Sequence, residues 1–487
     1  MQGALAGLPL AVVVLVLAVL HWRAAAAGAL GLGVALAVAA FGFGLPGGGE
    51  MLAGAGAEAL SSTATILWII LPALVIFEMQ TRAGALDRLR GALAGISDDR
   101  AVQALLIAWF FGLFMEGAAG FGTPVALAAP LLVGLGFAPL RAVALALLGH
   151  AAGVSFGAVG TPALAQIEML GLSPAALAAA TVALHAVPAL VLALWVMWLA
   201  LGARPSAPQA GVALLAAVCF VAPALALAAL AGPELPTMGG ALIGGAVFAL
   251  LMRGRSGGGG SGGWRLADLL PYLLIVGLVL LTRLVPPLQD ALSGIWLGWE
   301  WGDYSGGLAP FYHPGTLLAV GVCLSAALTG RAWLLAPALG AALRRLAPVA
   351  LALLVMLALA RLMVHGGLIA ALAETAAAAG VVWPLLAPFI GVLGTFVTGS
   401  ATASNILFTD FQAETAEALG LPVTLMAAAQ GVGAAIGNAV APHNIIAGSA
   451  TVGIAGREGA VLSQTLAPVV VYAALAGAVV LGWAALG

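Results

Sequence analysis

A carboxylate, three glycines and a proline interrupt an apolar segment in the stretch EGAAGFGTP, residues 116–124. A helix that faces lipid cannot continue through such a run, because the bilayer core holds no water to solvate the freed backbone groups. Non-helical backbone at that depth is tolerated only where protein buries it or where it lines a polar cavity. The stretch TGSATASN, residues 398–405, has the same character in the second half of the chain. We interpret the two breaks as the walls of one substrate site.

Composition places these breaks in a membrane protein. The 487-residue chain is 63% hydrophobic and 7% charged, and its mean hydropathy is +1.17, which is too apolar for a water-soluble protein. The net charge of −2 provides no basic surface for a nucleic acid. The sequence shows neither clustered metal ligands nor a nucleophilic serine with a base, so we expect no metal, no cofactor and no enzyme.

The apolar segments predict an all-α, polytopic fold with twelve transmembrane helices and two re-entrant hairpins, with both termini outside. The expected spans cover residues 4–20, 24–45, 59–79, 140–168, 174–202, 210–231, 238–252, 267–284, 314–330, 347–364, 423–455 and 463–486. Residues 101–137 and 383–417 are expected to form the hairpins, because their arms are shorter than the about 20 residues that cross a bilayer.

Glycines and serines at residues 256–263 predict a flexible cytoplasmic loop between a first half, residues 1–255, and a second half, residues 264–487. Glycines and prolines of the two halves match at an offset of about 280 residues: Gly84 with Gly367, Gly117 with Gly399, Gly136 with Gly420, Pro139 with Pro422, Gly153 with Gly433, Gly157 with Gly437 and Pro162 with Pro442. We therefore expect repeats at about residues 59–168 and 347–455, which are inverted in this topology. Inverted repeats whose broken helices meet at the membrane midplane are typical of secondary transporters. Half-helix N-termini there suit a carboxylate.

Three motifs resemble the L-lactate permease family of bacterial transporters. They are FMEGAAGFGTPVALAAPLLVGLGF at residues 114–137, SFGAVGTP at residues 155–162 and FVTGSATASNILF at residues 396–408. The resemblance implies proton-coupled uptake of L-lactate, or of a related 2-hydroxymonocarboxylate such as glycolate, across the bacterial cytoplasmic membrane. It also implies elevator motion of a transport domain and, by analogy alone, a homodimer.

The chain departs from the family pattern within these motifs and near them. Ala401 stands where the family usually has an acid, and His150 where it has asparagine. Asn438 and His443 stand where it has lysine and glutamine. An acid and a base are thus lost together, which is electrostatically consistent. Sodium coupling, transport of another organic anion and an anion channel are the alternatives that stay open.

Candidates for the proton-coupling group are Glu116, His150 and Asp410. Removing a carboxyl group from water favours its protonated form, so Glu116 can load and release a proton inside the membrane. The alternative is that Glu116 only caps backbone amides of the hairpin. Asp410 is a candidate replacement for the acid missing at position 401, and His150 titrates in the useful range.

Candidate substrate-binding residues flank the breaks. They are Gly120, Gly122, Thr123 and Thr161 in the first half, and Arg361, Ser400, Thr402, Ser404, Asn405, His443 and Asn444 in the second. Their hydroxyl and amide groups can donate to a carboxylate, or can merely satisfy the backbone of the broken helices. Arg361 is either a clamp for a carboxylate or a partner of Glu78, with which it aligns in the other repeat.

Overall fold

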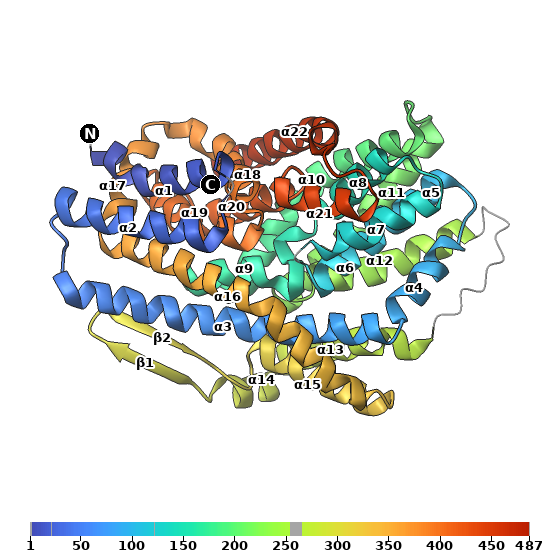
Figure 1. Cartoon of the computed structure of the whole chain (residues 1–487), viewed down its shortest axis with the longest axis horizontal. Coiled ribbons are helices and arrows are strands. Elements are labelled where there is room, and N and C mark those ends of the chain that lie inside the picture. The colour runs from blue at the N-terminus through green and yellow to red at the C-terminus, as the bar shows by residue number, and fades with distance from the viewer. Residues whose placement is uncertain (1, 21, 121, 254–264, 487) are drawn as a thin grey trace.

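Two long helices, α3 (Gly48–Arg82) and α16 (Leu335–His365), pack along each other and follow the long axis of the molecule (Figure 1). At 35 and 31 residues, both exceed the about 20 residues that cross a bilayer. The computed structural model describes residues 2–20, 22–120, 122–253 and 265–486. The predicted loop at residues 256–263 lies outside the described residues.

Each long helix leads into a similar short helix through a glycine. Gly84, with φ of +64°, precedes α4 (Ala85–Ala94), and Gly367, with φ of +76°, precedes α17 (Leu368–Ala377). Only glycine adopts this left-handed conformation without strain. Figure 1 places α4 and α17 at opposite ends of the long axis, so the two series of helices run in opposite directions.

The two series then continue with corresponding elements. The first consists of α5 (Arg100–Ala104), the π-helical η1 (Leu105–Phe111), α6 (Gly112–Ala118), α7 (Thr123–Gly134), α8 (Pro139–Ala151), η2 (Val154–Phe156), α9 (Gly157–Leu170) and α10 (Pro174–Leu201). The second consists of η4 (Gly380–Val382), α18 (Trp383–Thr398), α19 (Ala401–Ala418), α20 (Val423–Gly437), α21 (Pro442–Thr451) and α22 (Glu458–Ala485). In the first series α7 turns back on α6 and η1, and in the second α19 turns back on α18. Each series ends in a 28-residue helix, and these two helices, α10 and α22, contact each other.

Further helices surround the two series. They are α1 (Gln2–Ala18), α2 (Ala24–Gly42), α11 (Ala207–Ala231), α12 (Pro236–Arg253), α13 (Leu266–Leu284), α14 (Pro286–Ser293), α15 (Pro314–Leu328) and η3 (Ala332–Leu334). The all-α prediction needs one correction, because β1 (Leu297–Trp301) and β2 (Tyr304–Leu308) form an antiparallel hairpin against α3. Aromatic residues of these segments, Trp299, Trp301 and Tyr304, favour strands.

Ten helices among the described residues are long and apolar enough to cross a membrane, or up to eleven with a bent pair. That pair, Pro139–Ala151 and Val154–Leu170, is bent by 62°. The ten include the first arms of both predicted hairpins, Arg100–Ala118 and Gly380–Thr398. Three predicted spans, in α1, α12 and α15, are shorter apolar helices. The prediction of a multi-pass helical membrane protein is therefore confirmed, whereas twelve spans with two hairpins stay a prediction.

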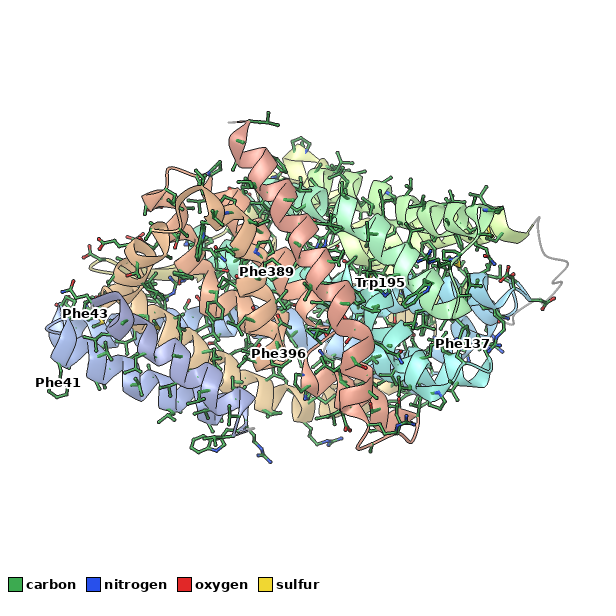
Figure 2. All side chains as sticks on the ribbon, turned by 90° about the horizontal axis from the view of Figure 1, so that it is seen from above. Phe41, Phe43, Phe137, Trp195, Phe389 and Phe396 are labelled. Carbon is green, nitrogen blue, oxygen red and sulfur yellow. The ribbon has the colours of Figure 1, made fainter. Side chains whose placement is uncertain are left out.

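Apolar side chains are exposed along the outside of the bundle (Figure 2). Phe41, which is 93% exposed, lies with Phe43 at one end, and Phe137 lies toward the other. Large apolar side chains in contact with the surroundings are typical of surfaces that face lipid. The interior is packed mainly with alanine and other aliphatic residues. The aromatic side chain of Trp109 is fully buried between them.

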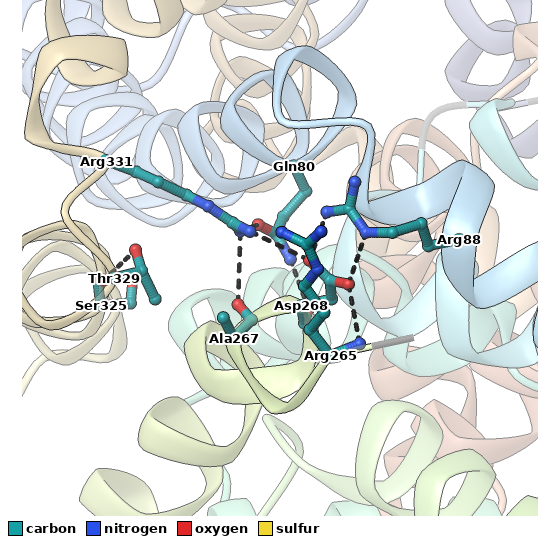
Figure 3. Close-up of polar contacts among 8 residues, drawn as sticks. All are labelled: Gln80, Arg88, Arg265, Ala267, Asp268, Ser325, Thr329 and Arg331. Carbon is teal, nitrogen blue, oxygen red and sulfur yellow. Dashed lines mark hydrogen bonds and ion pairs between the residues drawn. The ribbon is translucent and has the colours of Figure 1, made fainter. Parts of the chain in front are cut away.

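A buried aspartate ties α3, α4 and α13 together (Figure 3). The carboxylate of Asp268 accepts hydrogen bonds from Arg88 Nε at 2.8 Å and from Arg331 Nη2 at 3.1 Å. The backbone N–H of Arg265 donates to it at 3.1 Å, and Gln80 Nε2 donates to the Asp268 backbone oxygen at 2.5 Å. Several donors thus compensate the burial of one charge.

Candidate functional site

Four helices begin at breaks, and the breaks before α7 and α19 are those that the sequence predicts at residues 116–124 and 398–405. α7 begins at Thr123, α19 at Ala401 and α21 at Pro442, and α9 resumes at Thr161 after a kink. The first N–H groups of a helix lack partners within the helix, so each N-terminus carries a partial positive charge. Such a group of N-termini suits an anion if the four lie close together.

Contacts at two glycines bring three of these N-termini together. A methyl group added to Gly122, just before α7, would lie 3.4 Å from Oδ1 of Asn444 in the first turn of α21. A methyl group added to Gly399, just before α19, would lie 3.0 Å from Cβ of His443. Because His443 and Asn444 are neighbours, the two hairpin tips lie against the same turn of α21.

The fourth N-terminus, that of α9, contacts α19 and α7. Nδ2 of Asn405 donates to the backbone oxygen of Pro162 at 3.0 Å. Val154, before the kink, packs with Ala401 in one buried cluster. A methyl group on Gly120 would lie 3.1 Å from the backbone nitrogen of Ala158. All four breaks therefore belong to one network of contacts.

The kink in α9 holds its backbone in an unusual conformation. Ala158 and Val159 have φ of +42° and +56°, and Gly160 follows with φ of +87°. Positive φ is unusual for alanine and strained for a β-branched residue. A methyl group on Gly160 would lie 2.5 Å from the backbone oxygen of Pro233, so tight packing holds the kink in place. Strained backbone of this kind tends to occur at functional sites.

Glu116 and His150 form a buried pair beside these breaks. Oε2 of Glu116 lies 3.8 Å from Nε2 of His150. Nδ1 of His150 donates to the backbone oxygen of Ala146 at 2.6 Å, because a carbonyl oxygen can only accept. In the neutral imidazole, Nε2 then carries a lone pair, while Oε2 of Glu116 has no hydrogen-bond partner among the described residues. One added proton would satisfy both atoms.

Two glycines allow Glu116 to approach the breaks. A methyl group on Gly157 would lie only 2.2 Å from Oε1 of Glu116, and one on Gly120 would lie 3.5 Å from it. Gly157 precedes the kink in α9, and Gly120 precedes α7. The carboxyl group therefore lies next to two of the four helix N-termini.

Three of the predicted hydroxyl groups serve the protein itself. Thr123 Oγ1 donates to the backbone oxygen of Gly120 and Thr161 Oγ1 to that of Ala158, both at 2.7 Å. Ser404 Oγ donates to the backbone oxygen of Gly391 at 3.0 Å and accepts from Gln430 Nε2 at 3.2 Å. These contacts match the alternative in which the hydroxyl groups form hydrogen bonds with backbone groups of the broken helices.

Other predicted residues lie at the N-termini of α19 and α21. Ser400 caps α19, accepts from the N–H of Ala403 at 3.3 Å and is half-buried. Thr402 is buried in the first turn, and Asn405 keeps a buried Oδ1 that has no partner among the described residues. His443 is exposed. Asn444 is buried, and its Nδ2 donates to the backbone oxygen of Asn438 at 3.2 Å.

Arg361 lies away from the four N-termini, in a charged group with Glu58. Its Nε is 3.8 Å from Oε2 of Glu58, and its Nη2 donates to the backbone oxygen of Met169 at 3.5 Å. Nε2 of His365 lies 2.8 Å from the same carboxylate oxygen. Asp410 interacts electrostatically with Arg361, and its buried Oδ2 has no hydrogen-bond partner among the described residues.

The alternative pairing of Arg361 with Glu78 is wrong. Oε1 of Glu78 lies 3.2 Å from Arg345 Nη1, and its Oε2 lies 3.8 Å from Arg82 Nε. Arg361 instead contacts Glu58, from an earlier turn of α3. Alignment of the two repeats matched Arg361 with Glu78 in sequence, but matched positions in inverted repeats need not contact each other.

A buried chain of hydrogen bonds was not predicted from the sequence. Ser155 Oγ lies 2.8 Å from His185 Nε2, and His185 Nδ1 lies 2.5 Å from the hydroxyl oxygen of Tyr472. Ser155 also donates to the backbone oxygen of Gly431 at 3.0 Å. The chain joins α10 and α22 to the break before α9. A histidine inside the apolar α10 was the available signal, because ionisable residues within membrane helices are seldom accidental.

Comparison with known proteins gives consistent matches. The family model described as L-lactate permease matches residues 3–255 and 307–486. The chain is 28% identical over 460 residues to the L-lactate permease of Salmonella typhimurium, covering 85% of this chain and 83% of that protein. It is 28% identical over 484 residues to the glycolate permease GlcA of Escherichia coli, covering 88% and 86%. It is 31% identical over 436 residues to the L-lactate permease of Halalkalibacterium halodurans, covering 82% and 81%. The solved structure of Neisseria gonorrhoeae MtrF aligns with a TM-score of 0.48 at 17% identity, over 87% of this chain and 81% of that one.

Proposed function

This chain belongs to the L-lactate permease family, and from that premise we propose that it takes up L-lactate, or a related 2-hydroxymonocarboxylate such as glycolate, together with a proton. Its relatives are permeases, which are transporters and not enzymes. Because its relatives are bacterial permeases and its described residues include ten candidate membrane spans, the chain is a multi-pass protein of the bacterial cytoplasmic membrane.

The substrate carboxylate binds among the four helix N-termini. The contacts of Gly122 with Asn444 and of Gly399 with His443 support this placement, because they bring partial positive charges from both halves to one turn of α21. In the described part of the chain, the hydroxyl group of Ser400 donates to no residue and the amide oxygen of Asn405 has no partner, so a hydroxy acid can use both. Thr123, Thr161, Ser404 and Asn444 shape the site through contacts within the protein.

The proton binds between Glu116 and His150, and this buried pair is the observation that carries the proposal. An ionised Glu116 would repel a substrate carboxylate bound at the adjacent N-termini, since charges interact strongly in a region of low dielectric constant. Protonation of the pair removes that repulsion. Binding of the proton therefore favours binding of the anion, and by linkage the anion favours the proton to the same degree. That reciprocity is the basis of symport.

The two series of helices that begin with α3 and α16 are inverted repeats, and α6–α7 and α18–α19 are re-entrant hairpins within twelve spans. The equivalent glycines Gly84 and Gly367, and the positions of α4 and α17 at opposite ends, support this arrangement (Figure 1). Exchange of conformation between inverted repeats produces alternating access. We propose that the transport domain moves as an elevator.

Uptake into proteoliposomes tests the function. Labelled L-lactate, glycolate and pyruvate are presented under an imposed pH gradient, alkaline inside, with and without sodium. We expect L-lactate or glycolate to accumulate without sodium and an uncoupler to abolish the accumulation. Accumulation that requires sodium, or no accumulation of any of the three acids, contradicts the proposal.

A further inference from the structure

A cavity of about 380 Å³ with a mostly apolar lining lies where α9, α10, α11, α13 and α15 meet. It borders the N-terminus of α9, because a methyl group on Gly160 would lie 3.2 Å from the backbone nitrogen of the wall residue Glu234. Its walls include Leu164, Glu168, Glu234, Arg283, Trp296 and His313. The spacing of Leu164 and Glu168 places them on the same face of α9 as Thr161. The cavity therefore extends along the helix whose kink contributes to the proposed substrate site.

One wall of the cavity carries an ion pair with an unused oxygen atom. Arg283 Nη2 lies 2.5 Å from Oε1 of Glu234, and the guanidinium lies over the ring of Tyr312, 3.8 Å from its centroid. The side chain of Glu234 is only 2% exposed, and its Oε2 has no hydrogen-bond partner among the described residues. A buried carboxylate oxygen without a donor is costly, so this atom points to a ligand that brings one.

His313 offers a donor in the same cavity. The N–H of Gly315 donates to its Nδ1 at 3.2 Å, so the neutral ring carries its hydrogen on Nε2. Burial and the positive charge of Arg283 lower the pKa of His313 to about 4, which keeps the ring neutral near pH 7. Arg283 and His313 together supply donors, whereas Glu234 requires one.

We infer that this cavity is a second binding site for a small hydroxy carboxylic acid, whose hydroxyl group donates to Oε2 of Glu234 and whose carboxylate accepts from Arg283 and His313. The inference rests on the proposed substrate class. A hydroxy acid carries a donor and an acceptor on neighbouring carbon atoms, as these walls require, and Leu164 and Trp296 cover its apolar part. The volume is within the range of about 300–1,000 Å³ that is usual for small-molecule sites.

The site should select for the hydroxyl group. An acid of the same size that lacks the hydroxyl leaves Oε2 of Glu234 unpaired, and sites built to bond a hydroxyl reject such analogues strongly. Propionate is the matched probe, because it is L-lactate without its hydroxyl group. The ratio of the two affinities therefore measures the proposed contact.

Equilibrium dialysis of labelled L-lactate against the purified full-length protein, with propionate as competitor, measures that ratio. In the wild type we expect two L-lactate sites per protein, and at the site beside Glu234 we expect L-lactate to bind at least about ten-fold more tightly than propionate. Glu234→Ala should weaken L-lactate binding at this site by about ten-fold, leave the site among the helix N-termini unchanged, and leave propionate binding within about two-fold. Glu300→Ala removes an exposed acid of β1 and serves as the control, with an unchanged ratio.

A second, more conservative variant controls for misfolding of Glu234→Ala. Glu234→Gln keeps the side-chain shape and a partner for Arg283, but presents an amide donor in place of the acceptor, so the ratio should again fall. An unchanged ratio in both variants, or an equal loss of both ligands, overturns the inference. Dialysis needs no ion gradient, so it can be compared with uptake by the wild type. If the wild type shows proton-driven uptake but the variants leave the ratio of the two affinities unchanged, this site alone is overturned. If the variants change the ratio as expected but the wild type shows no proton-driven uptake, the proposed coupling alone is overturned.

Discussion

Glu116 and His150 lie 3.8 Å apart, measured from Oε2 to Nε2, and their side chains are only 4% and 2% exposed. His150 is held by its hydrogen bond to the backbone oxygen of Ala146, so its second ring nitrogen faces the carboxyl group. Neither residue needs to move far to share a proton. Gly157 and Gly120 place this pair next to the helix N-termini at which we propose the substrate binds.

Gly157→Ala should disable the proton site without breaking the helix. Gly157 has φ of −61°, which alanine adopts freely, but its methyl group would lie 2.2 Å from Oε1 of Glu116. Displacing a carboxyl group by about 1 Å can cost on the order of 100-fold in a positioned site. We expect proton-driven uptake to fall at least about ten-fold while the amount of folded protein is unchanged. Gly134→Ala is the control, because its added methyl group would meet no neighbouring atom within 4 Å. Uptake at the wild-type rate by Gly157→Ala would refute this account of Gly157.

Ser404→Ala and Ser400→Ala should differ in what they affect. Ser404 is fully buried and bonded to Gly391 and Gln430, so its loss should cost about 1 kcal/mol of stability and leave the KM for L-lactate unchanged. Ser400 donates to no group among the described residues, so its loss should raise KM several-fold. Thermal unfolding in detergent and initial rates of uptake separate the two effects. The reverse pattern would mean that Ser404 contacts the substrate.

Asp268→Asn should destabilise the protein through the contacts in Figure 3. The variant leaves Arg88 and Arg331 without their shared carboxylate, and removing one member of a buried ion pair typically costs about 3–5 kcal/mol. Since Arg88 is 28% exposed, we expect about 2 kcal/mol or more. Asp290→Asn, at an exposed position of α14, is the control for thermal unfolding at pH 7. Equal unfolding temperatures for the two variants would show that the Asp268 contacts contribute nothing.

His313 should make stability depend on pH below neutrality. Burial, and then the charge of Arg283, lower its pKa in the folded protein to about 4, from an ordinary value of 6.5. The contribution of neutral His313 to the free energy of unfolding is therefore fully present above pH 6.5 and is lost as the pH falls toward 4, because the unfolded chain binds the proton first. His313→Asn keeps an acceptor for the N–H of Gly315 but does not titrate. Its unfolding temperature should fall less than that of the wild type between pH 7 and pH 5, and equal falls would exclude His313 as the titrating group.

Local composition predicted where the helices break. The tip of the second hairpin was expected within residues 398–405, and α18 ends at Thr398 while α19 begins at Ala401. Glycine and proline act on the conformation of their own segment, so a break is visible without knowledge of the fold. The same holds for Gly84 and Gly367, whose positive φ angles precede equivalent helices.

Partners distant in the sequence could not be predicted in the same way. Arg361 contacts Glu58 and not Glu78, and Arg283 contacts Glu234. These choices depend on how long helices pack side by side, which no local pattern encodes. Ser404 shows the same limit, because its hydroxyl group could equally have faced a ligand until the position of Gln430 was known.

The movement of protons by a gradient of L-lactate tests the central claim most directly. Proteoliposomes containing a pH-sensitive dye receive external L-lactate at equal internal and external pH, and exchange of labelled L-lactate is measured in parallel. The wild type should acidify the interior as L-lactate enters. Glu116→Gln should still exchange L-lactate but produce no acidification. Acidification by Glu116→Gln at the wild-type rate would contradict the account.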